Sequence, residues 1–231
     1  MASAPTKTDD LLRLARKGPL RARDLAAAGI PRVYLGRLCD RGLLEVVDRG
    51  LYRLTDASVT ENDSLAEVSK RVPHATVCLL SALQFHGMTT ESPHAVWVMI
   101  DRHARRPKLT YPKLEVVRAS AAARDHGVQQ RTIEGVVVQM TSPAKTVADC
   151  FRYRRHVGLE VAIAALRDYL DRSRRQAPHG RCRQPASRSS RGSSTARDRD
   201  TATDYSIDAL VAAARADRVY ALLRPYLEAL A

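Results

Sequence analysis

The feature that most constrains the fold is a glycine between two short apolar-periodic segments, followed directly by two strand patterns. Segments with the spacing of short amphipathic helices flank Gly29, where a residue without Cβ takes a positive φ at little cost. Asp48-Arg49-Gly50 then separates residues 43–47 from residues 51–54 as a hairpin turn would. This order predicts a winged helix-turn-helix, a fold that sets one helix into the DNA major groove.

The segment 31–41 is the predicted recognition helix. Pro31 suits a first helical turn, because its missing N–H would be unpaired there in any case. Helical spacing gives the segment two sides, and we expect the apolar one to pack inward. The inward side consists of Leu35, Leu38 and Cys39, and the opposite side of Val33, Gly36, Arg37 and Asp40.

Six side chains are the candidates for contact with DNA. Arg37 is central on the outer side, and arginine can donate two hydrogen bonds to O6 and N7 of guanine. Arg49 at the hairpin tip and Arg53 on the return strand are placed to touch phosphates or the minor groove. The predicted DNA-binding residues are Arg32, Tyr34, Arg37, Arg41, Arg49 and Arg53. The alternative is that these side chains form a solvated surface of a domain that binds another protein.

Charge and length fit a nucleic-acid partner. The 231 residues carry a formal net charge of +13, and the first 55 hold eleven Lys and Arg against six Asp and Glu. No N-terminal apolar segment resembles a signal peptide, and no run approaches the length of a membrane span. The four cysteines lack pairing motifs, so we expect no disulfide framework. These observations predict a cytoplasmic protein without membrane contact.

The remainder of the chain predicts a second domain. Residues 63–171 alternate helix and strand patterns, and the run at 95–100 is almost wholly apolar, as in a buried strand. The other predicted strands are 114–118 and 136–140, and the predicted helices are 64–72, 76–86, one beginning at Ser142-Pro143, and 159–170. The predicted fold class is α+β: a winged helix-turn-helix over residues 1–56, then a larger mixed α/β domain with a small sheet over residues 57–171 and 205–231.

Residues 172–204 differ in kind from their surroundings. They contain nine Arg but no Val, Ile, Leu, Met, Phe, Tyr or Trp, so they have little to bury and are predicted to be a disordered insertion. One interpretation is an arm that adds phosphate contacts without sequence information. The others are an inert spacer and a segment translated out of frame.

Several motifs together resemble the AbiEi-type antitoxins of type IV toxin–antitoxin pairs. The matching pieces are RGLYRL (49–54), LLSALQFHGMT (79–89), VWVMI (96–100), TSPAKTVADCFRYR (141–154) and RPYLEAL (224–230). They span nearly the whole chain except residues 172–204, where the sequence departs from the family pattern. The resemblance implies an N-terminal domain that binds inverted repeats in its own promoter and represses its operon. It also implies a C-terminal domain that neutralises a co-encoded nucleotidyltransferase-like toxin.

The sequence offers few signs of catalysis. No two histidines have the spacing of a zinc site, and no Cys-x-x-Cys or Walker-type glycine loop is present. Ser142 is better explained as a helix cap, and Asp149 as a partner of Lys145 four residues earlier. We therefore expect no enzyme activity, no metal site and no cofactor.

The residues and the resemblance together predict a DNA-binding antitoxin that represses its own operon by binding double-stranded DNA, either as a monomer or as a dimer. The alternative is a winged-helix regulator whose C-terminal domain senses a ligand or dimerises. A third and weaker hypothesis is a DNA-modifying or DNA-cleaving enzyme with a winged-helix targeting domain. A downstream gene for a nucleotidyltransferase-like protein would favour the first.

Overall fold

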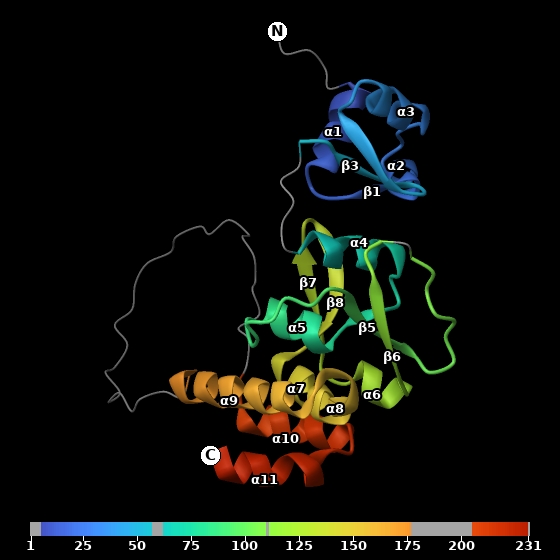
Figure 1. Cartoon of the computed structure of the whole chain (residues 1–231). Coiled ribbons are helices and arrows are strands. Elements are labelled where there is room, and N and C mark those ends of the chain that lie inside the picture. Colours follow the sequence, from blue (N-terminus) through green and yellow to red (C-terminus); the bar gives the residue numbers. More distant parts are fainter. Residues whose placement is uncertain (1–5, 57–61, 110, 177–204, 231) are drawn as a thin grey trace, which may run out of the picture.

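The chain folds into a small N-terminal domain and a larger C-terminal one (Figure 1). The computed structural model describes residues 6–56, 62–109, 111–176 and 205–230. The elements of the N-terminal domain are α1 (Lys7–Ala15), β1 (Leu20–Arg21), α2 (Ala22–Ala27), α3 (Val33–Asp40), β2 (Leu44–Asp48) and β3 (Leu51–Leu54). The three strands form an antiparallel sheet in the order β1-β3-β2. Three helices and this hairpin confirm the predicted winged helix-turn-helix.

Local chemistry explains where these elements begin and turn. Helix α1 begins at Lys7, because Thr6 and Asp9 form a reciprocal capping box. Gly29 has φ 64° between α2 and α3, and Gly50 has φ 72° in the hairpin turn. Both glycines therefore stand where the sequence placed the turns. A single apolar core, which includes Leu25, closes the domain.

The larger domain is built on a mixed five-stranded sheet in the order β6-β5-β4-β8-β7. Its elements are α4 (Asp63–Arg71), β4 (Thr76–Val77), α5 (Leu79–Phe85), β5 (Val96–Asp101), β6 (Leu114–Ala119), α6 (Ala121–Asp125), β7 (Val128–Ile133), β8 (Val136–Thr141), α7 (Pro143–Arg152), α8 (Arg154–Val157), α9 (Leu159–Gln176), α10 (Ile207–Ala216) and α11 (Tyr220–Leu230). Strands β5 and β6 are parallel, as are β4 and β8, whereas β4–β5 and β7–β8 are antiparallel.

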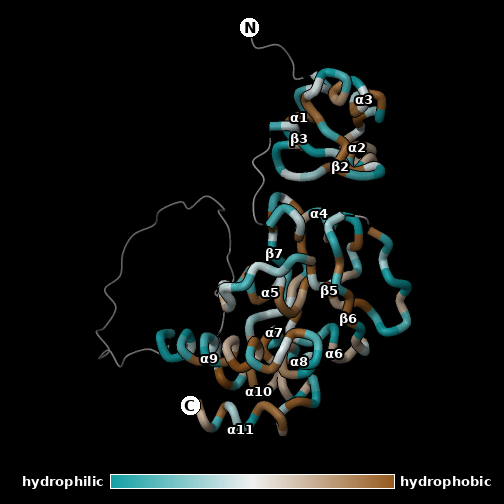
Figure 2. Tube along the Cα trace, in the orientation of Figure 1, coloured by the Kyte–Doolittle hydropathy of each residue, from teal (hydrophilic) through white to brown (hydrophobic). Residues whose placement is uncertain are grey.

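The two faces of this sheet bury different cores. On β5, Val96 and Val98 face a core that includes α4, whereas Trp97 and Met99 face one that includes α7, α9, α10 and α11. Both faces are thus covered, which explains why the strand is an uninterrupted apolar run. The apolar residues gather along β5 and in the helices below it in Figure 2, while the end of α9 that leads to Gln176 is hydrophilic.

The expected elements of this domain need four corrections. The helix expected over 76–86 begins at Leu79, because residues 76–77 instead pair with β5 and β8. The polar edge strand β7 has too few apolar residues to be recognised from sequence. Helix α9 runs on to Gln176, so residues 172–176 are helical, and the rest of the predicted disordered insertion lies outside the described residues. A proline within a helical pattern predicts a kink or an end of the helix, but Pro225 lies inside α11, and the break between α10 and α11 comes earlier, near Arg218, which has φ 59°.

The N-terminal domain contacts the larger one mainly through α4. Lys70 Nζ lies 2.6 Å from Asp24 Oδ2, and Arg71 pairs with Asp48 beside the hairpin turn. A second contact joins the loop after α1 to the β7–β8 turn, where a Cβ on Gly135 would collide with the carbonyl oxygen of Lys17. Because these contacts come from α2, the hairpin and the loop after α1, helix α3 is left on the far side of the domain (Figure 1).

Candidate nucleic-acid interface

Helix α3 separates its side chains as the sequence predicted. Leu35 and Leu38 are buried in the N-terminal core, and Cys39 packs against it in part. The opposite side, formed by Val33, Gly36, Arg37 and Asp40, is exposed. The helix is therefore anchored by its apolar side and presents a polar side with a single central arginine. Its first turn begins at Val33 rather than at Pro31, whose carbonyl oxygen accepts a hydrogen bond from the N–H of Tyr34.

Arg37 is held in place by a neighbour on the same helix. Its guanidinium lies 5.5 Å from the centre of the Tyr34 ring, within the range of a cation–π contact. Tyr34 itself is half-buried against the N-terminal core. The ring thus limits the rotamers of an otherwise exposed side chain, which reduces the entropy lost when the guanidinium binds a ligand.

Three more candidates are exposed cations of the same domain. Arg32 is the N-cap of α3, and Arg41 is its C-cap. Arg49 lies in the turn between β2 and β3, where its backbone N–H donates to Asp48 Oδ1 over 2.6 Å. Arg32 and Arg41 thus flank α3, as phosphate-contacting side chains would, whereas Arg49 lies in the hairpin whose Asp48 pairs with Arg71 of α4.

Arg53 is placed differently from the other five candidates. Its guanidinium donates two hydrogen bonds to Glu45 Oε1, and it also pairs with Asp63 over 3.4 Å and with Glu67 over 3.8 Å. The hydrogen bond with Glu45 raises the pKa of Arg53, and its side chain is only 23% exposed. The sequence reasoning missed these carboxylates because two of them belong to α4. In this structure Arg53 joins the domains, so we do not retain it as a DNA contact.

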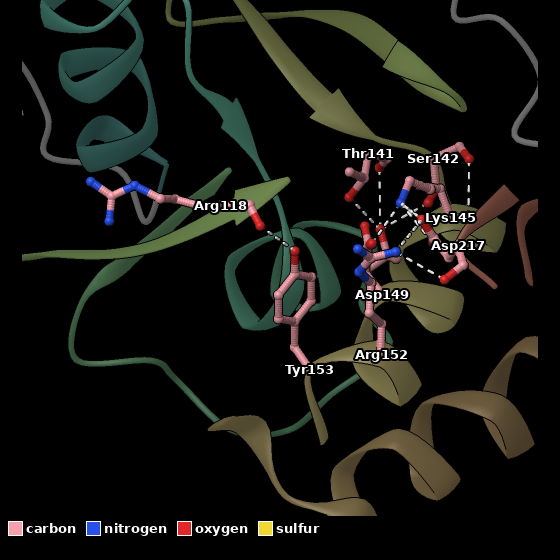
Figure 3. Close-up of polar contacts among 9 residues, drawn as sticks. Arg118, Thr141, Ser142, Lys145, Asp149, Arg152, Tyr153 and Asp217 are labelled. Atoms are coloured by element: carbon pink, nitrogen blue, oxygen red, sulfur yellow. Dashed lines mark hydrogen bonds and ion pairs between the residues drawn. The ribbon is translucent and has the colours of Figure 1, made fainter. Parts of the chain in front are cut away.

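The larger domain contains a buried ionic cluster between α7 and the end of α10 (Figure 3). Lys145 Nζ lies 2.5 Å from Asp149 Oδ1 and 2.7 and 2.8 Å from the two carboxylate oxygens of Asp217. The side chains of all three residues are fully buried. Arg152 adds a hydrogen bond to the carbonyl oxygen of Asp217 over 2.9 Å. The expected pairing of Lys145 with Asp149 is thus present, and a distant third partner completes it.

The cluster has two carboxyl groups, a buried lysine between them and, at its edge, the Arg152 guanidinium 3.9 Å from Asp217 Oδ1. Burial raises the pKa of Asp149 to about 8, with Lys145 opposing the rise and Asp217 adding to it. Asp149 Oδ2 has no hydrogen-bond partner among the described residues.

The surroundings of the cluster favour a structural role. Ser142 caps α7 by accepting a hydrogen bond from the N–H of Lys145, and the hydroxyl groups of Thr141 and Thr146 lie 2.7 Å apart. These bonds fix the first turn of α7, while Asp217 brings in a segment 72 residues away. The cluster therefore ties the C-terminal helices to the sheet domain.

In the described part of the chain, no three His, Cys, Asp or Glu side chains lie close enough together to hold a metal ion. Within the same residues, no helix combines the length and the apolar character that crossing a membrane requires.

Comparison with known proteins identifies the N-terminal domain. Residues 9–55 match the family model described as "Transcriptional regulator, AbiEi antitoxin". The matched residues run from the first turn of α1 to the end of the hairpin, so they contain the whole helix-turn-helix and its wing. No curated protein matches the chain. The N-terminal domain is therefore similar to the transcriptional regulators of the AbiEi-antitoxin family, and the match does not extend into the larger domain.

Proposed function

We propose that the protein is a DNA-binding antitoxin that represses its own operon and neutralises a co-encoded nucleotidyltransferase-like toxin. The observation that carries the DNA-binding part is the outer side of α3, where Arg37 is exposed, central and positioned by Tyr34. The match of residues 9–55 to the AbiEi-antitoxin family model supports the regulatory and antitoxin parts. The proposed DNA-binding residues are Arg32, Tyr34, Arg37, Arg41 and Arg49.

These residues divide into two kinds of contact. Arg37 projects from the middle of the helix that enters the major groove, so we assign it to a guanine. Arg49 projects from the hairpin turn, so we assign it to the phosphate backbone. Arg32 and Arg41 lie at the two ends of α3 and fit phosphates on either side of the groove.

Binding titrations of Arg37→Ala and Arg49→Ala on promoter DNA and on random duplex test this assignment. Losing the guanine contact costs about 1–3 kcal/mol on the promoter and relaxes specificity, whereas losing a phosphate contact weakens both duplexes alike. Lys108→Ala, an exposed cation outside the domain, is the matched control. Wild-type affinity of Arg37→Ala for the promoter would refute the choice of α3 as the recognition helix.

Toxin neutralisation is assigned to the larger domain. It has its own sheet and cores, and the predicted boundary near residue 56 separates them from the core of the winged helix. Residues 57–231, expressed from an unrelated promoter beside the toxin, should therefore protect cells, and residues 1–56 should not. Protection by residues 1–56 alone would contradict this division.

The alternative of a ligand-sensing regulator is favoured by one observation. A cavity of about 650 Å³ lies between α4, α5, the segment 89–96 and residues 111–113, and polar side chains including Gln84 and His94 line it. A small-molecule pocket has this size. If neighbouring genes encode no nucleotidyltransferase-like protein and a metabolite changes promoter affinity, the sensing function replaces the antitoxin function.

A further inference from the structure

Val33 is an exposed apolar side chain on the face that is proposed to meet DNA. It is 56% exposed, and it lies beside Arg37 on the outer side of α3. The other apolar side chains of this helix pack into or against the N-terminal core, but Val33 does not. A β-branched residue is also a moderate helix former, so neither packing nor propensity accounts for valine here.

Gly36 leaves open space on the same face. An added Cβ at this position would meet no atom within 4 Å, and the glycine does not adopt a positive φ. The fold therefore does not require glycine, although glycine within a helix costs about 0.5–1 kcal/mol relative to alanine. The missing side chain leaves a gap between Val33 and Arg37 through which the edge of a base pair can approach the helix backbone.

The chemistry of this face matches one base in particular. Thymine is the DNA base that presents a methyl group in the major groove, and apolar side chains recognise that group by contact. Arg37 lies four positions after Val33, which is about 6 Å along a helix at 1.5 Å per residue. Base pairs are stacked about 3.4 Å apart. A valine and an arginine at this spacing therefore face bases one or two steps apart.

We propose that Val33 contacts the C5 methyl group of a thymine one or two base pairs from the guanine bound by Arg37, and that Gly36 admits this close approach. This inference rests on the proposed DNA binding and adds the identity of a second base. It makes Val33 a specificity-determining residue, and it predicts that the operator contains a thymine within two steps of a guanine.

Methyl deletion on the DNA provides the test. The full-length protein first selects its preferred sequence from a library of random duplexes. Each thymine of the selected duplex is then replaced singly by deoxyuridine, which removes the methyl group and keeps the base pairing. Fluorescence anisotropy measures the dissociation constant of each duplex for wild type, Val33→Ala and Val137→Ala. Val137 is the matched control, because it is 60% exposed but lies on β8 of the larger domain.

The inference predicts a coupled result. One deoxyuridine weakens wild-type binding about fourfold, the equivalent of about 0.8 kcal/mol for one buried methylene-sized group. Val33→Ala weakens binding to the thymine duplex by a similar factor and is insensitive to deoxyuridine at that position. Val137→Ala behaves as wild type. Because Val33 is exposed, thermal unfolding of Val33→Ala should match that of wild type.

Three outcomes would overturn the inference in distinguishable ways. If no deoxyuridine weakens wild-type binding, or if Val33→Ala stays equally sensitive at the same thymine, Val33 does not read a methyl group although DNA binding stands. If Val33→Ala changes only the oligomeric mass, the side chain contacts a second copy of the chain. If the protein selects no sequence at all, the proposed DNA recognition fails, and this inference fails with it.

Discussion

Replacing Lys145 by methionine should destabilise the larger domain strongly. Methionine nearly preserves the length of the side chain but removes the charge that lies between Asp149 and Asp217. Both carboxyl groups are fully buried, so neither can recover its hydration without opening the structure. Removing one partner of a buried ion pair costs about 3–5 kcal/mol. At about 2–4 °C per kcal/mol for a chain of this size, Tm should fall by roughly 6–20 °C.

Urea unfolding at pH 7 measures this loss, with Lys108→Met as the control for an exposed lysine. The triple variant Lys145→Met/Asp149→Asn/Asp217→Asn should recover at least half of the loss, because neutral amides are less costly to bury than unpaired carboxylates. Promoter binding at a temperature where Lys145→Met is folded should be unchanged, since the winged helix has its own core.

The pH dependence of Lys145→Met provides the check on the mechanism. Without the lysine, nothing opposes the effect of burial on Asp149, so the pKa of Asp149 should rise further. The penalty should therefore shrink as the pH falls and this carboxyl group is protonated in the folded state. A free energy of unfolding of Lys145→Met equal to that of Lys108→Met at pH 7 would refute the reasoning. It would mean that water reaches the carboxylates.

Three further predictions concern pH and the contact between the domains. The pKa of Asp149 is raised from 3.8 to about 8 in the folded state, so between these pH values the folded protein binds more protons than the unfolded one. The stabilising contribution of Asp149 should therefore fall as the pH rises from 3.8 to about 8. In urea unfolding, Asp149→Asn should flatten the dependence of the free energy of unfolding on pH. Burial lowers the pKa of His86 from 6.5 to about 4, so its contribution should be lost as pH falls from 6.5 to 4, and His86→Gln should remove this acid sensitivity in the same assay. Lys70→Asp places a carboxylate opposite Asp24, so it should weaken the contact between the domains and raise the radius of gyration in small-angle scattering. Adding Asp24→Lys restores an opposite-charge pair and should reverse the change. Equal radii for all three proteins would show that this ion pair does not hold the domains together.

Local patterns determined most of the N-terminal domain in advance. Period-3.6 apolar spacing placed Leu35 and Leu38 inward and Arg37 outward, and Gly29 and Gly50 marked the turns, because these properties depend on neighbours within a few residues. The same held for Ser142 as the cap of α7. Caps, turns and the two sides of a helix are short-range features, so a single sequence carries them.

Contacts between distant segments were decided by the tertiary structure alone. The sequence predicted Arg53 as a DNA contact, but in the structure it pairs with Asp63 and Glu67 of α4. Lys145 pairs with Asp217, which lies 72 residues later in the sequence. The residues of strand β4 were expected to be helical. They form a strand because β5 and β8 pair with them on both sides, and no local pattern shows those neighbours. The sequence by itself determined which side of α3 faces solvent. Only the packing of the domains determined which arginines of the winged helix form ion pairs, because ion pairing depends on carboxylates that distant segments bring close.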